Sequence, residues 1–289
     1  MSERRLAGRR GICLSRGMRR VLLSGLLCGG LLAGAIAAEP VNEAPPPPPL
    51  QNEASAWQAW WVAHQADYAP AKVDAAVDGA MIAKMRNMGE ACTAANRMIV
   101  HENVAVEFST KLAEKMSGLK VLRGLDDESN IGPIIDEKSR ESIHELVTDA
   151  IAKGAKALTG GQVPSGAGYF YPPTVLTGVS RDARILKEEI FGPVAPIVTF
   201  KNEAEAIDLA NDTEYGLVAY AFTKDLNRGL RLAESLEVGM FGLNTGIVSN
   251  PAAPFGGVKA SGMGREGGIE GIEEYLETVY IGIADPFED

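Results

Sequence analysis

Apolar residues follow two different patterns along the chain from residue 72 onward. A spacing of three to four residues is typical of amphipathic helices, whereas short unbroken apolar runs are typical of buried strands. The first pattern predicts helices over 73–89, 106–116, 139–153, 204–211 and 227–236. The second predicts strands over 97–101, 194–200, 218–222 and 240–243. Because helices and strands alternate, we expect the α/β fold class, with a largely parallel sheet and flanking helices.

Residues 1–38 have the pattern of a secretory signal peptide. Seven arginines lie within the first twenty residues, and an uncharged apolar run over 21–38 ends in small residues around Ala35-Ile36-Ala37. A basic region, an apolar region and a small-residue cleavage site are the parts of such a signal. We therefore expect export, to the periplasm or outside the cell, and no stable membrane span after cleavage. An uncleaved membrane anchor is the alternative.

Residues 39–71 are predicted to connect this segment to the folded part of the chain. Five consecutive prolines at 45–49 favour an extended polyproline spacer. All the tryptophans of the chain, Trp57, Trp60 and Trp61, follow at helical spacing. A short helix that packs on the domain is favoured over a helix that docks a partner.

Charge and cysteine content exclude two classes of ligand. The chain has 28 basic and 38 acidic residues, a formal net charge of −10, and much of its arginine lies in the signal-like segment. An acidic body repels phosphate backbones, so we expect no nucleic-acid partner. Three cysteines and three histidines, at spacings that do not suit zinc, predict no metal site.

Cys92 lies among small residues in the sequence Met-Arg-Asn-Met-Gly-Glu-Ala-Cys-Thr-Ala-Ala-Asn-Arg, residues 85–97. The other cysteines, Cys13 and Cys28, lie in the signal-like segment, so the mature chain is expected to hold one thiol. A single thiol forms no internal disulfide. It is either a buried small hydrophobe or a nucleophile, and its spacing alone leaves both open.

Cys92 begins a series of four motifs. After its own come Lys-Glu-Glu-Ile-Phe-Gly-Pro at 187–193, Gly-Leu-Asn at 242–244 and Pro-Phe-Gly-Gly-Val-Lys-Ala-Ser-Gly-Met-Gly-Arg-Glu at 254–266. Together they resemble the C-terminal, catalytic part of an aldehyde dehydrogenase. Asn-Thr-Gly-Ile-Val-Ser-Asn, from residue 244, resembles the succinate-semialdehyde branch. The resemblance implies a partial aldehyde-dehydrogenase-like catalytic domain over 72–283, followed by a tail, residues 284–289.

The resemblance implies an aldehyde substrate and NAD or NADP as cofactor. Cys92 resembles the nucleophile, which forms a thiohemiacetal, passes a hydride to the nicotinamide and leaves a thioester for hydrolysis. Glu189 resembles the residue that holds the nicotinamide ribose, because a carboxylate accepts hydrogen bonds from both sugar hydroxyls. Phe191 resembles the residue that packs near the nicotinamide. Without the family, Glu189 would be read as a surface carboxylate and Phe191 as a core ring.

Three further residues match the substrate site of the succinate-semialdehyde branch. A semialdehyde that ends in a carboxylate needs a cation and hydroxyl donors at the far end of its tunnel. Arg86 matches the carboxylate-binding arginine, Ser249 matches its serine partner, and Phe255 would line the pocket wall. For Arg86 alone, a solvated arginine at a helix end is the alternative. Together these residues imply oxidation of succinate semialdehyde to succinate.

The family's N-terminal half has no recognisable counterpart before residue 72. That half carries most of the dinucleotide-binding domain, the oxyanion-hole asparagine and the glutamate that activates water, so impaired activity is expected. A non-catalytic exported binding or assembly module and a chimeric gene remnant are the alternatives to an enzyme. The family is normally cytoplasmic, which conflicts with the predicted export. Residues 275–283 resemble the family's C-terminal strand, which joins a neighbouring subunit, and imply a homo-oligomer.

Overall fold

The computed structural model describes residues 73–284. The signal-like segment, the proline-rich linker and the tryptophan-rich stretch all lie outside the described residues, as do residues 285–289 of the tail. The helices are α2 (Val73–Met85), α3 (Glu102–Ser117), α4 (Glu137–Ala152), α5 (Glu203–Asn211) and α6 (Leu226–Ser235). The main strands are β1 (Met98–His101), β2 (Lys156–Thr159), β3 (Thr174–Thr177), β4 (Val194–Phe200), β6 (Val218–Ala221) and β7 (Met240–Leu243).

The central sheet has the strand order β1-β4-β3-β2. Strand β4 runs parallel to β1, with Met98 opposite Ile197, and parallel to β3, with Thr174 opposite Val194. Only the edge strand β2 pairs antiparallel in this sheet. The predicted α/β class and largely parallel sheet are confirmed. Because parallel neighbours begin at the same edge, the segments that precede β1 and β4 lie close together.

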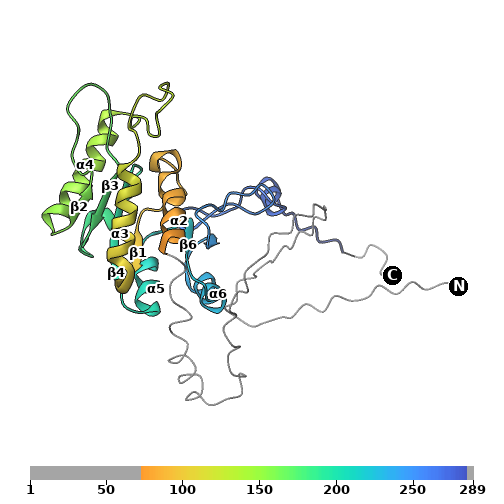
Figure 1. Ribbon diagram of the computed structural model, residues 1–289. Coiled ribbons are helices and arrows are strands. Elements are labelled where there is room, and N and C mark those ends of the chain that lie inside the picture. The colour runs from red at the N-terminus through yellow and green to blue at the C-terminus, as the bar shows by residue number, and fades with distance from the viewer. Residues whose placement is uncertain (1–72, 285–289) are drawn as a thin grey trace, which may run out of the picture. The chain divides into compact units, whose positions relative to one another are not determined.

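Helices cover both faces of the sheet, which explains the unbroken apolar sequence of β4. Val194 and Val198 pack in the cluster that contains α4, whereas Ala195 and Ile197 pack in the cluster that contains α2 and α3. Figure 1 shows α2 and α3 side by side next to the sheet. A parallel strand buried on both faces needs apolar residues at successive positions rather than at alternate ones.

The helices start earlier than their apolar spacing predicts because polar side chains cap them. Asp136 accepts a hydrogen bond from the Ser139 amide, 2.7 Å away, so α4 begins at Glu137. In the same way Asn202 accepts from the Glu205 amide, at 3.0 Å, at the start of α5. Such caps satisfy amide groups that have no partner in the first helical turn.

The prediction of a continuous helix over 73–89 is wrong in its last turn. The α-helix ends at Met85, and Arg86–Gly89 forms a short 3₁₀ turn. Asn87 and Met88 have positive φ values of 46° and 51°, which no helix accommodates. The apolar Met88 continues the helical spacing, but the backbone has already turned toward Cys92. Strands β2 and β3 were not predicted. The residues of β2 are mostly exposed, and β3 has only two apolar residues, which stand between two threonines.

The C-terminal strand implied over 275–283 does not form in the single chain. Glu270–Tyr275 is a 3₁₀ helix, and residues 276–284 have no strand assignment. A strand needs a hydrogen-bonded neighbour, and this segment finds none within the described part of the chain. It nevertheless exposes large apolar side chains, including Tyr280 at 92% and Ile283 at 83%.

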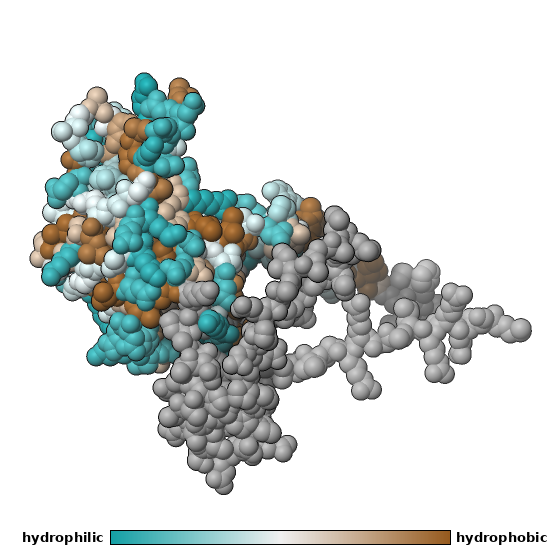
Figure 2. All heavy atoms as spheres, in the orientation of Figure 1, coloured by the Kyte–Doolittle hydropathy of each residue, from teal (hydrophilic) through white to brown (hydrophobic). Residues whose placement is uncertain are grey.

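The surface outside this segment is mixed. Figure 2 shows hydrophilic and hydrophobic residues interspersed on the visible face. Scattered exposed apolar residues of this kind are normal for a folded domain. No helix within residues 73–284 is long and apolar enough to cross a bilayer.

Candidate active site

Two loops meet where β1 and β4 begin. We call residues 89–97 the Cys92 turn and residues 187–193 the Glu189 loop. Gly89 has a φ of 87°, and a Cβ atom on it would lie only 2.2 Å from the carbonyl oxygen of Gly192. The Cys92 turn therefore requires glycine at this position, both for its backbone conformation and for its close approach to the Glu189 loop. The sheet thus brings together two motifs that are far apart in sequence.

Cys92 is an exposed, free thiol. The residues around it are fixed: the Ala95 amide donates to the Ala83 carbonyl of α2 at 2.9 Å, and the Tyr220 hydroxyl of β6 donates to the Thr93 carbonyl at 3.1 Å. Burial raises the pKa of Tyr220, while its bond to Thr93 and the charge of Arg86 act in the opposite direction. An exposed thiol on a fixed turn can approach a substrate carbonyl, whereas a buried one could not.

Glu189 and Phe191 both lie on the outside of the Glu189 loop. Phe191 is 44% exposed and has a φ of 48°, an unusual conformation for a bulky residue. Such residues often mark functional sites. The Glu189 carboxylate is exposed and can accept hydrogen bonds from two neighbouring hydroxyl groups. A carboxylate and an aromatic ring, on a loop that packs against the Cys92 turn, could hold the nicotinamide-ribose end of a dinucleotide.

Arg86 and Ser249 are 163 residues apart in sequence and lie in contact. The Arg86 Nη1 atom donates to the Ser249 hydroxyl at 3.1 Å. Small residues make this approach possible, because a Cβ atom on Gly246 would lie 2.2 Å from the Gly79 carbonyl oxygen of α2. The loop that carries Ser249 therefore packs directly on the helix that leads to Arg86. A guanidinium and a hydroxyl side by side form a suitable pair of donors for a carboxylate.

Phe255 is positioned by a different loop. Its backbone exchanges two hydrogen bonds with Glu266, at 2.6 and 2.7 Å, and its ring is half-buried. This bridge fixes the loop, but it does not by itself bring the ring to Cys92.

The sequence analysis missed Lys84, a buried residue below the site. Lys84 lies in the last turn of α2 and is 1% exposed. Burial lowers its pKa to about 7, and the charge of Glu189 partly offsets this effect. A polar residue inside an otherwise apolar helical spacing was the only available signal. A titratable group thus lies within electrostatic reach of the Glu189 carboxylate.

Glu90, two residues before Cys92, has a structural role. Its carboxylate accepts a hydrogen bond from the Ile135 amide at 3.3 Å. Burial raises the pKa of Glu90, and this bond lowers it. Glu90 thus attaches the segment before α4 to the Cys92 turn.

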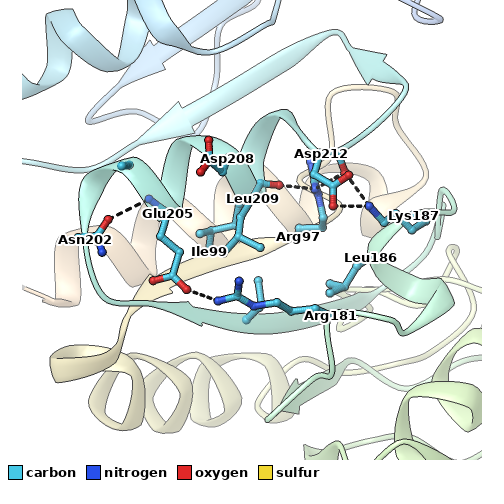
Figure 3. Close-up of a pocket in the computed structure, with 12 residues that line it drawn as sticks. Arg97, Ile99, Arg181, Leu186, Lys187, Asn202, Glu205, Asp208, Leu209 and Asp212 are labelled. Atoms are coloured by element: carbon cyan, nitrogen blue, oxygen red, sulfur yellow. Dashed lines mark hydrogen bonds and ion pairs between the residues drawn. The ribbon is translucent and has the colours of Figure 1, made fainter.

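One cavity of the described part does not have Cys92 among its lining residues. It has a volume of about 470 Å³ and opens beside α5, as Figure 3 shows. Its cations already have partners, since Arg181 pairs with Glu205 and Lys187 pairs with Asp212. The exposed thiol and its neighbours, rather than this cavity, mark the candidate site. Within residues 73–284, no group of three His, Cys, Asp or Glu side chains could hold a metal ion.

Three cations bind the carbonyl end of α5. The Arg97 guanidinium donates to the Leu209 and Ala210 carbonyls at 2.8 and 2.9 Å. The Lys187 ammonium donates to the Asp212 carbonyl at 3.2 Å, and the Lys259 ammonium donates to the Asn211 carbonyl at 2.9 Å. These bonds satisfy carbonyl groups at the helix end. The positive charges are also stabilised by the negative end of the helix dipole. They hold the Glu189 loop against α5.

The sequence profile of the aldehyde dehydrogenase family matches residues 47–281. The chain belongs to this family. A succinate-semialdehyde dehydrogenase of Paenarthrobacter nicotinovorans is 60% identical over 219 residues, which are 76% of this chain and 49% of that protein. A glutarate-semialdehyde dehydrogenase of Pseudomonas putida is 49% identical over 74% of this chain and 44% of its own length. The chain thus spans about half the length of the curated relatives it matches.

Solved aldehyde dehydrogenase structures have the same fold. The crystal structure of succinate-semialdehyde dehydrogenase from Burkholderia pseudomallei matches with a TM-score of 0.70 and 50% sequence identity. The match covers 71% of this chain and 43% of that one. The described residues thus form a partial aldehyde-dehydrogenase-like domain.

We predict that Lys84→Met stabilises the fold in a pH-dependent way. The folded-state pKa of Lys84, about 7, lies below its ordinary value of 10.5, so the unfolded chain binds more protons between these values and stability rises with pH. Methionine removes the cost of burying the ammonium. The variant should therefore gain on the order of a few kcal/mol over the wild type near pH 7, and the gain should shrink toward pH 10.

Urea unfolding at several pH values measures this difference in the free energy of unfolding. The control is Lys115→Met, which replaces a half-exposed lysine that pairs with Asp78 on the surface. A difference between Lys84→Met and wild type that stays constant from pH 6 to 10, as for the control, would contradict the prediction.

Proposed function

We propose that this chain carries the thiol-containing half of an NAD(P)-dependent aldehyde dehydrogenase that oxidises succinate semialdehyde to succinate. The observation that carries the proposal is the Arg86–Ser249 pair beside the turn that presents Cys92. Relatives named succinate-semialdehyde dehydrogenase, one of which has NADP(+) in its name, support both the substrate and the cofactor class.

The chemistry begins at the Cys92 sulfur. The thiolate attacks the aldehyde carbon, a C–S bond forms, and the resulting oxyanion can accept hydrogen bonds from backbone amides. NAD(P), when bound, would supply the acceptor for a hydride from this carbon, which would leave the carbon as a thioester of Cys92. Water then attacks the thioester, the C–S bond breaks, and succinate and the thiol are released. Glu189 and Phe191 would hold and orient the nicotinamide ribose end.

The carboxylate of the substrate would determine which aldehydes bind well. Succinate semialdehyde carries one negative charge, and Arg86 supplies a fixed positive charge with several donors in one plane. Ser249 already contacts Arg86 and holds its guanidinium in place. An uncharged aldehyde of the same length would gain nothing from this pair.

We also propose that the C-terminal segment, residues 276–284, pairs with a second copy of the chain. This segment exposes apolar side chains, including Val279, Tyr280 and Ile281, and its backbone has no strand partner in the single chain. An extended segment of this kind can add a strand to another sheet edge, which satisfies its backbone and covers its side chains.

The first prediction for this function concerns the thiol. Purified chain should reduce NAD or NADP in the presence of succinate semialdehyde, and Cys92→Ala should lower the rate at least about 1000-fold, because no other group forms the covalent intermediate. Reduced cofactor is followed by its absorbance. Cys28→Ser, which changes a cysteine of the signal-like segment, should keep the wild-type rate. No turnover by a folded sample would contradict the proposal and favour a non-catalytic module.

A second prediction tests the carboxylate site. Arg86→Met should raise the KM for succinate semialdehyde about 10- to 100-fold, since a charge-assisted hydrogen bond is lost, and Ser249→Ala should raise it less. Butanal, which has the same carbon count without the carboxylate, should react almost equally well with all three proteins. Arg123→Met, which removes an exposed arginine paired with Asp126, is the matched control. An equal loss for both aldehydes would assign Arg86 a structural role instead.

A third prediction tests assembly. Wild-type chain should sediment as a dimer or larger species, and Ile281→Asp should shift it toward the monomer, because a charge on a buried pairing strand is costly. Leu125→Asp, at a residue that is 97% exposed on a distant loop, should leave the distribution unchanged. If both variants sediment like the wild type, the C-terminal segment is not the contact.

A further inference from the structure

Asn96 bridges the backbone on both sides of Glu189. Its Nδ2 atom donates to the Glu188 carbonyl at 2.8 Å, and its Oδ1 atom accepts from the Ile190 amide at 2.9 Å. The two bonds fix which way the side-chain amide faces, because a flipped amide would place donor against donor. One side chain of the Cys92 turn thus holds the residues immediately before and after Glu189.

The segment held by Asn96 is strained. Phe191 has a φ of 48°, a conformation in which the Cβ atom of a non-glycine residue crowds the neighbouring backbone. Such a conformation persists only where the surroundings determine it. Here the residue before Phe191 is bonded to Asn96, and the residue after it, Gly192, packs against Gly89. Without both contacts the loop would relax toward an ordinary conformation.

We propose that Asn96 is a positioning residue that fixes Glu189 and Phe191 relative to Cys92. It lies four residues after the thiol, on the same turn, so its two bonds set the separation between the thiol and the cofactor-facing groups. This inference rests on the proposed function for its catalytic meaning. The buried Lys84 interacts electrostatically with the same carboxylate.

The same bridging geometry occurs at a second asparagine, which offers a matched control. Asn211 donates to the Ser235 carbonyl at 2.9 Å and accepts from the Glu237 amide at 2.9 Å. Asn211→Ala therefore removes the same two kinds of bond, but between α5 and the segment after α6. Asn96→Asp is the complementary variant, since it keeps an acceptor for the Ile190 amide and replaces the donor to Glu188 by a carboxylate oxygen.

Hydrogen exchange tests the positioning role without cofactor. In Asn96→Ala the Ile190 amide should exchange about tenfold faster than in wild type, because its acceptor is gone. In Asn96→Asp this amide should stay protected, and in Asn211→Ala it should match wild type. Equal exchange at Ile190 in Asn96→Ala and wild type, or an equal rise in Asn211→Ala, would overturn the inference.

A kinetic comparison tests the catalytic meaning. Asn96→Ala should raise the KM for NAD(P) about tenfold, with an unchanged KM for the aldehyde and an unchanged rate of Cys92 alkylation by iodoacetamide. The alkylation is measured with Cys13 and Cys28 replaced by serine. An active Asn96→Ala enzyme with a wild-type cofactor KM would overturn the role toward the cofactor. If the wild type shows no turnover, the proposed function fails, and the exchange experiment alone decides whether Asn96 fixes the loop.

Discussion

The parallel pairing of β1 with β4 is the interaction on which the candidate site depends. The two strands are separated by almost a hundred residues, and their pairing brings the Cys92 turn and the Glu189 loop to one edge of the sheet. Burial on both faces fixes the register, because a slip by one residue would exchange the side chains between the two apolar clusters. The core thereby sets the position of an exposed thiol relative to an exposed carboxylate.

Glycines are as important as large side chains at this edge of the sheet. Gly89 and Gly246 each allow a backbone approach that a single methyl group would block. One approach joins the thiol turn to the Glu189 loop, and the other brings Ser249 to Arg86. The site therefore combines long polar side chains for contact with glycines for close packing. Loss of either the glycines or the polar contacts would move apart residues that are distant in sequence but adjacent in the site.

The sequence predicted the long elements and the motif residues but not the contacts between them. Apolar spacing located α4 and β4 because both bury several residues in the core. It did not locate β2 and β3, because β2 is mostly exposed and β3 has only two apolar residues in succession. It also extended α2 into a turn with positive φ values, since spacing of apolar residues carries no information on backbone handedness.

The same limit applies to the site. The resemblance assigned roles to Cys92, Glu189, Phe191, Arg86, Ser249 and Phe255. The structure places Arg86 and Ser249 in contact. The sequence analysis did not find Asn96, Lys84 or Tyr220. Their partners lie on other elements, so their roles depend on tertiary contacts that no local pattern encodes.

The carbonyl end of α5 has a consequence for the order in which the chain folds during synthesis. Its three cations come from positions 97, 187 and 259, so two leave the ribosome before the helix and one leaves well after it. Until Lys259 emerges, part of the helix end must be hydrated instead. This group of hydrogen bonds is therefore complete only after nearly the whole domain has been synthesised. Only then does the end of α5 hold the segments of Arg97 and Lys187 with all three cations bound.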